Sequence, residues 1–149
     1  MTKDVEGPSR PAGEVAELSR QECLDLLATQ SVGRLACNRP GAPPWVTPVN
    51  YRFDGEEIAF GLDPKMEPQV PLHSEVSFEV DWIDWEHRMG WSVLVQGIAH
   101  ESAHSEKHSA GLWAPGASQV LMRLALASVN GRRLLPAELV WPVEGDGYL

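Results

Sequence analysis

The stretch VTPVNYRFDGEEIAF, residues 46–60, carries two runs rich in β-branched and aromatic residues on either side of Asp54-Gly55. An Asp-Gly pair between such runs is a strong signal for a β-hairpin, because glycine accepts the backbone angles of a tight turn. We therefore predict strands at 45–53 and 57–62, joined by this turn.

The rest of the chain repeats this pattern of short apolar segments separated by turn residues. It predicts four more strands, at 33–37, 76–82, 91–100 and 120–129. Six short strands with few helices favour a mainly β fold, a small six-stranded antiparallel barrel.

One helix is predicted before the strands, from Ser19 to about Gln30. Ser19 followed three residues later by Glu22 forms a capping box, which marks a helix start. The apolar side chains that would form its buried stripe are Cys23, Leu24, Leu26 and Leu27.

Length and charge limit the classes of protein. A chain of 149 residues fits one domain, which we place at 14–141 between a disordered arm at 1–13 and a tail at 142–149. A formal charge of -9 disfavours nucleic acid as a partner. We expect no membrane span and no secretion signal, and hence a cytoplasmic protein in which Cys23 and Cys37 are buried, reduced thiols.

The strand GWSVLVQG, residues 90–97, has two unlike faces. In a strand, Trp91, Val93 and Val95 leave one face, whereas the other face carries Ser92, Leu94 and Gln96. This second face either lines a ligand site or is the polar outer face of a half-exposed strand. The tryptophans at 82, 85 and 91 suit a core edge, a subunit interface or a ring-stacking site.

No metal site is predicted. His100, His104 and His108 are spaced four apart, which suits metal or haem ligands on a helix, but Ser, Glu and Lys surround them. A solvated helix face is therefore the expected structure. The carboxylates around His87 are expected in a hydrated loop, and the chain has no dinucleotide-binding, P-loop, zincin or hydrolase-elbow motif.

The order of motifs resembles a known family. After the capped helix come SVGRLA (31–36), VTPVNYRFDGEEIAF (46–60), Lys65, VSFEVDWID (76–84), GWSVLVQGIA (90–99), LWAPG (112–116) and NGRRL (130–134). Over about residues 14–135 the chain resembles the pyridoxamine phosphate oxidase-like flavin-binding split barrels, especially their small actinobacterial-type and nitroimidazole-resistance-like members.

The resemblance implies a homodimer with FMN held at two symmetric sites between the subunits. It implies that one strand runs its backbone beside the flavin ring, that a lysine binds the phosphate, and that a second strand reaches the ring or the ribityl chain. The matching residues are Thr47, Pro48, Val49 and Asn50, then Lys65, then Trp91 and Ser92.

The chain departs from the family pattern around Lys65, where Asp63, Pro64 and Glu67 stand. At about 6 Å and an effective dielectric near 20, each carboxylate would cost phosphate binding on the order of 2 to 3 kcal/mol. We expect an arginine to compensate, and the candidates are Arg34, Arg52, Arg123 and Arg132.

The function implied is a flavin-dependent oxidoreductase acting on a small organic substrate, with no acid or base residue assigned. A non-catalytic protein that binds flavin, deazaflavin or haem is the alternative, as is a dimeric barrel without a cofactor. Oxidation of pyridoxamine phosphate is not expected, because NGRRLLPAELVWP (130–142) does not match that enzyme's substrate-binding segment.

Overall fold

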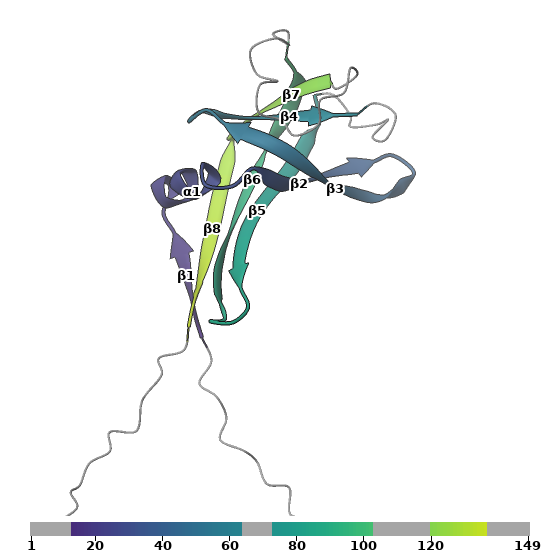
Figure 1. Cartoon of the computed structure of the whole chain (residues 1–149). Coiled ribbons are helices and arrows are strands. Elements are labelled where there is room, and N and C mark those ends of the chain that lie inside the picture. Colours follow the sequence, from purple (N-terminus) through teal and green to yellow (C-terminus); the bar gives the residue numbers. More distant parts are fainter. Residues whose placement is uncertain (1–12, 64–72, 103–119, 137–149) are drawn as a thin grey trace, which may run out of the picture.

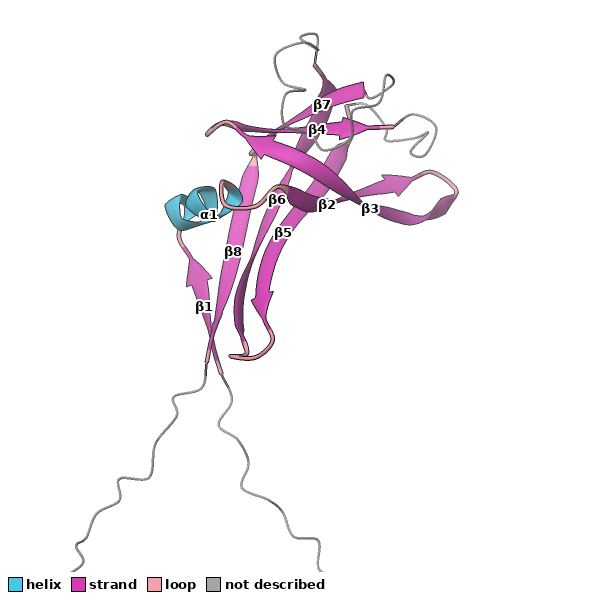
Figure 2. Ribbon diagram, viewed as in Figure 1, coloured by secondary structure: helices cyan, strands magenta, loops and turns pink. Residues whose placement is uncertain are grey.

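The computed structural model describes residues 13–63, 73–102 and 120–136 (Figures 1 and 2). Residues 1–12, the tail at 142–149, Lys65, His104 and His108 lie outside the described residues. In chain order the elements are β1 (Glu14–Leu18), α1 (Arg20–Leu27), β2 (Val32–Arg39), β3 (Ala42–Phe53), β4 (Glu57–Leu62), β5 (Glu75–Asp84), β6 (Met89–Glu101), β7 (Val120–Ala125) and β8 (Ser128–Leu135).

Six of the strands close into an antiparallel barrel, which confirms the predicted fold class. The order is β6-β5-β2-β3-β4-β7, and β7 pairs back onto β6. The hairpin predicted at Asp54-Gly55 joins β3 to β4, with Gly55 at a φ of 103°. Closure leaves the apolar side of each strand facing the barrel interior.

Strand β6 belongs to two parts of the molecule. Its last residues, 99–101, pair with β7 inside the barrel, whereas residues 90–96 pair with β8. Strand β1 then adds to the outer edge of β8. In Figure 1, β8, β1 and the adjoining halves of β5 and β6 extend away from the barrel as a ribbon.

The prediction of one strand over 120–129 is wrong. Strand β7 ends at Ala125, where a turn follows in which the Ala127 N–H donates to the Ala125 carbonyl at 3.0 Å, and β8 begins at Ser128. This turn lets β7 pair with the last residues of β6 and β8 pair with its first residues. Strand β1 was not predicted, because five residues with two glutamates show little apolar alternation.

The barrel interior is filled by aromatic and branched side chains. Phe78 is fully buried, with its ring 5.1 Å from that of Tyr51 and 6.0 Å from that of Phe60. The Tyr51 hydroxyl donates a 2.5 Å hydrogen bond to the Leu27 carbonyl, and burial raises the pKa of Tyr51. This bond ties α1 to the barrel.

Helix α1 begins as predicted and ends three residues earlier. The capping box is complete: the Ser19 hydroxyl accepts from the Glu22 N–H at 3.2 Å, and a Glu22 carboxylate oxygen accepts from the Ser19 N–H at 2.7 Å. At the other end, Thr29 turns back to donate its hydroxyl to the Leu26 carbonyl.

Cys23 of α1 and Cys37 of β2 are both buried and free, as expected, and burial raises the pKa of each thiol. Among the described residues, no helix has the length and apolar character needed to cross a membrane.

Candidate functional site

The four β3 residues that match a flavin-binding strand lie along an open strand edge. On one side, β3 pairs with β2 from residue 42 to residue 50, but on the other side it pairs with β4 only at residues 51–53. In the described part of the chain, no strand pairs with the second edge of β3 over 42–50. Its backbone groups are available there for a ligand or another chain.

The alternation of hydrogen bonds along β3 decides which of these groups point outward. The Tyr51 N–H bonds the Ser31 carbonyl at 2.9 Å, so odd-numbered residues direct their backbone groups to β2. The Pro48 carbonyl and the Asn50 N–H therefore point to the open edge, where the Pro48 carbonyl accepts a 3.5 Å hydrogen bond from the Thr47 hydroxyl. The Asn50 carbonyl belongs to the last ladder position with β4, next to the pairing of Tyr51 with Phe60. Pro48 has no N–H, so Asn50 supplies the donor at this point.

The side chains of the same four residues divide between the two faces. Val49 is buried in the core and Thr47 lies on the same face, whereas Pro48 and Asn50 face outward. The Asn50 Nδ2 is buried and has no hydrogen-bond partner among the residues that the structure describes. An unpaired buried donor is costly, on the order of 1–3 kcal/mol, and in a native fold it calls for an explanation.

Trp91 and Ser92 leave opposite faces of β6, as the alternation predicted. Trp91 is half-buried, packs against the core and lies opposite Trp82 of β5. Ser92 lies on the outer face, opposite Asp81 of β5 and Arg132 of β8. The two side chains therefore face different sides of the sheet.

The structure does not bring the β3 and β6 residues together within one chain. Strands β2 and β5 lie between β3 and β6. Three strand spacings of about 4.8 Å separate them by about 14 Å along the sheet. Strand order is a tertiary property, and nothing in the sequence motifs signals this separation.

Two hollows mark the outer face of the sheet. The larger has a volume of about 460 Å³ and contains Gln96, whose amide donates to the Ser77 hydroxyl at 3.2 Å. The smaller, about 320 Å³, contains Ser92. Ser92 and Gln96 thus each face a hollow. The larger hollow was not identified from the sequence because its lining residues come from separate strands. Its lining residues are Ala36, Cys37, Asn38, Pro44, Glu75, Val76, Ser77, Gln96, Gly97, Ala127 and Ser128.

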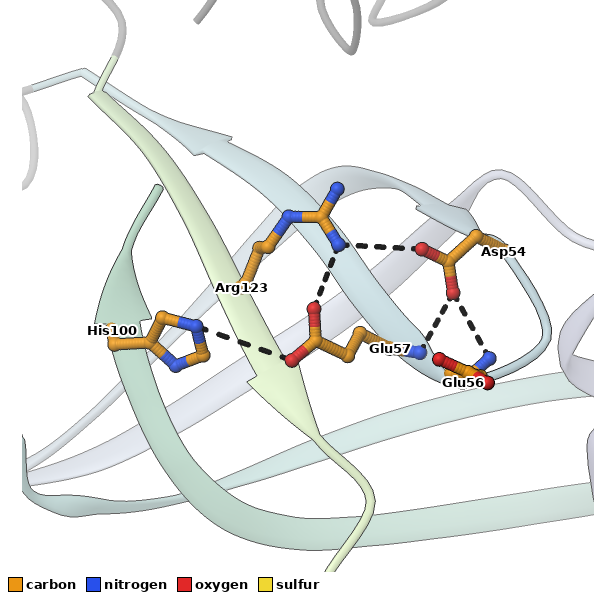
Figure 3. Close-up of polar contacts among 5 residues, drawn as sticks. All are labelled: Asp54, Glu56, Glu57, His100 and Arg123. Carbon is orange, nitrogen blue, oxygen red and sulfur yellow. Dashed lines mark hydrogen bonds and ion pairs between the residues drawn. The ribbon is translucent and has the colours of Figure 1, made fainter. Parts of the chain in front are cut away.

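Two of the arginines considered as phosphate partners are held by carboxylates. Arg123 of β7 contacts Glu57 at 2.7 Å and Asp54 at 3.3 Å (Figure 3). Arg34 of β2 contacts Glu79 at 3.0 Å and Asp81 at 3.3 Å. Burial and the neighbouring Asp81 raise the pKa of Glu79 despite this contact with Arg34.

His100 lies on β6, within the strand predicted at 91–100, and β6 continues through Glu101. Its Nε2 lies 4.0 Å from a carboxylate oxygen of Glu57, beside the Arg123 ion pair (Figure 3). Within the described ranges, no group of three or more histidine, cysteine, aspartate or glutamate side chains is placed to hold a metal ion.

The loop around His87 forms as expected. The Asp84 carboxylate accepts from the N–H groups of Glu86 and His87, and it lies 2.7 Å from the His87 Nδ1. The contacts with His87 and Glu86 lower the pKa of Asp84. They order the turn between β5 and β6, where the Trp85 side chain is 82% exposed.

Comparison with known proteins relates this architecture to flavin-binding proteins. An uncharacterized Mycobacterium tuberculosis protein, Rv0080, is 37% identical over 102 residues, which are 64% of this chain and 66% of that protein. The FAD-binding protein from Mycobacterium smegmatis has a similar structure, with a TM-score of 0.63, 25% identity, and coverage of 80% of this chain and 98% of that chain. A FAD-binding protein from Mesorhizobium loti has a TM-score of 0.63, 28% identity, and coverage of 80% and 97%.

A family model described as pyridoxamine 5'-phosphate oxidase matches residues 19–133. These residues run from the N-cap of α1 to β8 and include every strand of the closed barrel. The chain therefore belongs to the pyridoxamine 5'-phosphate oxidase family of split-barrel proteins.

Proposed function

We propose that the chain binds a flavin nucleotide with its ring along the open edge of β3. The observation that carries the proposal is this edge itself, where no described strand pairs with the Pro48 carbonyl or with the Asn50 N–H. Two similar structures, at 25% and 28% identity, are of FAD-binding proteins. The edge of a flavin ring alternates donors and acceptors, so such a strand edge suits it.

The residues of this edge fit a planar, polar ligand. The Pro48 carbonyl would accept from a ring N–H, and the Asn50 N–H would donate to a ring carbonyl. The buried Asn50 Nδ2 offers a further donor. A bound flavin would supply hydride and single-electron chemistry, and the protein would position and tune it. FMN remains our specific prediction, with Lys65 as its phosphate partner.

We further propose that the site is completed by a second copy of the chain. The β6 segment at Trp91 and Ser92 lies about 14 Å from the β3 edge in the same sheet, so a homodimer is the simplest way to bring this segment to the same flavin, with the Ser92 side chain facing outward. The outer face of the ribbon carries exposed apolar side chains suited to an interface, namely Val15, Ile83 and Leu134.

The proposed activity is that of a flavin-dependent oxidoreductase that acts on a small organic substrate. We place it in the cytoplasm, where the two free thiols of Cys23 and Cys37 would stay reduced. No described side chain is assigned as a general acid or base, because in this class the flavin carries the redox step.

Flavin binding is tested by titrating the flavin-free full chain with FMN, FAD and riboflavin and following the flavin fluorescence. We expect micromolar or tighter binding, and a loss of about tenfold in Asn50→Ala, which corresponds to one hydrogen bond of about 1.4 kcal/mol. Asn38→Ala on β2 is the matched control and should leave the affinity unchanged. Absence of binding by all three flavins would overturn the proposal.

Two further measurements separate the finer parts of the proposal. Bleaching of the flavin absorbance by NADH or NADPH would support the oxidoreductase, whereas a bound flavin that neither donor reduces would indicate a binding protein. Sedimentation of the loaded protein tests the dimer, and a monomer that retains the flavin would contradict completion of the site by a second copy.

A further inference from the structure

The smaller hollow on the outer face is a groove between β1, β6 and β8. Its volume is about 320 Å³, and both polar and apolar residues line it. Its lining residues are Glu17, Leu18, Ser92, Leu94, Val129, Asn130, Gly131 and Arg132. A pocket of this size, with an apolar side chain beside a few polar groups, suits a small organic molecule.

Arg132 is the only cationic side chain that lines either hollow in the described part of the chain. It lies directly opposite Ser92 in the pairing of β8 with β6, so both side chains leave the same face of the sheet. The neighbouring Arg133 lies opposite Trp91 and faces the other side. Strand register therefore assigns Arg132, and not Arg133, to the groove.

The charge of Arg132 is not used within the described structure. Arg34 and Arg123 each contact two carboxylates, but no described carboxylate lies within 4.0 Å of a nitrogen of Arg132. Glu17 is its partner in the β1–β8 register and lines the same groove, without forming this contact. In a chain of net charge -9, such an arginine is available to a ligand of opposite charge.

Neutral hydrogen-bonding groups lie beside Arg132 in the groove. The Ser92 hydroxyl lines the groove, and Asn130 donates its amide to the Ser128 hydroxyl at 3.2 Å, which leaves the Asn130 carbonyl oxygen as an acceptor. A guanidinium and a hydroxyl together provide donors for the oxygens of a carboxylate or phosphate. Leu94, on the same face as Ser92, provides a surface for an apolar ring or chain.

We infer that this groove binds a small organic anion, with Arg132 and Ser92 holding its carboxylate or phosphate and Leu94 packing against its apolar body. The inference rests on the proposed function in one respect: the anion is then either the oxidoreductase substrate or the phosphate end of the flavin nucleotide. Glu17 opposes the anion, so its carboxylate weakens binding.

The test that does not depend on flavin uses benzoate and phenyl phosphate as probes, with neutral benzyl alcohol as the reference, in calorimetric titrations of the full chain. We expect millimolar or tighter binding of both anions and weaker binding of the alcohol. Arg132→Gln should weaken anion binding at least tenfold, Glu17→Gln should strengthen it two- to threefold, and Arg133→Gln should change it by less than twofold. Thermal melting of each variant checks that it is folded.

Equal losses in Arg132→Gln and Arg133→Gln, or equal binding of anions and alcohol, would overturn the inference. FMN and riboflavin identify the source of the anion. If Arg132→Gln weakens the binding of FMN but not of riboflavin, the groove holds the flavin phosphate. If Arg132→Gln weakens the binding of benzoate but leaves FMN binding intact, the groove holds a substrate. If the chain binds the anions but no flavin, the inference about the groove stands and only the proposed function is refuted.

Discussion

The closed barrel and the ribbon that extends from it are both built from strands with alternating apolar residues, but they differ in how far those residues are buried. In the barrel, apolar side chains such as Ile58, Phe78 and Leu124 are fully buried, because closure gives their face an enclosed interior. In the ribbon, Val15 is 60% exposed and Leu134 is 41% exposed, because no described element covers the outer face. Apolar alternation therefore predicts a strand, but closure decides whether it becomes core or recognition surface.

Three exposed apolar side chains of the ribbon, Val15, Ile83 and Leu134, form one row. Ile83 pairs with Gly90, Gly90 with Leu134 and Leu134 with Val15, so all four residues share the outer face. The same face carries Ser92 and the anion groove farther along β6. We therefore expect the barrel to set the stability of the protein and the ribbon to set what it binds.

The largest effect that distinguishes the two regions is expected from Phe78→Ala. Phe78 is fully buried and contacts two other rings, so its removal leaves a cavity in the barrel. We expect the free energy of unfolding to fall by about 3–5 kcal/mol, measured by urea denaturation followed by tryptophan fluorescence.

The matched ribbon variant is Leu134→Ala, which removes an apolar side chain that is 41% exposed. We expect a loss below about 1 kcal/mol at a concentration where the protein is monomeric. Similar losses in the two variants would show that the ribbon is as much a part of the core as the barrel.

A smaller effect is expected where the barrel and the ribbon part on β6. Gly97 lies between the residues that pair with β8 and those that pair with β7. A Cβ on Gly97 would lie 2.3 Å from the Ala125 carbonyl oxygen, which is backbone and has little freedom to move. Gly97→Ala should therefore cost about 1–3 kcal/mol by thermal or urea unfolding.

Gln96→Ala, one residue away on the exposed face, is the control and should change the free energy of unfolding by less than about 0.5 kcal/mol. If Gly97→Ala unfolds like the wild type, β6 is free to shift at the junction, and the barrel and ribbon are not fixed relative to one another.

Sequence reasoning identified the barrel because its signals are local. The Asp54-Gly55 turn, the capping box at Ser19 and the apolar alternation each depend on residues close together in the chain. The end of β7 was missed because residues 120–129 read as one run, and the break depends on which part of β6 each half meets. Strand β1 was missed because pairing with β8, and not an apolar face of its own, holds it in the sheet.

The candidate site divides in the same way. The sequence predicted that Ser92 and Gln96 share a face, and both line hollows. It did not reveal that β2 and β5 separate Ser92 from Asn50, or that Arg123 and Arg34 are held by carboxylates while Arg132 faces the groove. Those facts depend on strand order and register, which no single segment encodes.

The smallest effect concerns the charge cluster that links the β3–β4 turn of the barrel to β7. Partial burial raises the pKa of Asp54, but the N–H groups of Glu57 and Glu56 and the Arg123 guanidinium lower it more, so it lies below its usual value. A lowered folded-state pKa contributes stability above the unfolded value of about 3.9, and that contribution is lost as the pH falls through the folded value.

Asp54→Asn keeps an oxygen that accepts from the two N–H groups but removes the charge beside Arg123. We expect the variant to be slightly less stable than wild type at pH 7 and equally stable at pH 2, measured by urea unfolding across this range. Asp25→Asn, on the exposed side of α1, removes the same charge without these contacts and serves as the control. If the two variants show the same dependence on pH, the loss reflects net charge, and the Asp54 contacts do not stabilise the turn. If only Asp54→Asn reduces the fall in the free energy of unfolding between pH 7 and pH 2, the charge of Asp54 stabilises the turn of the barrel. In the ribbon, by contrast, the charge of Arg132 stays available for a ligand.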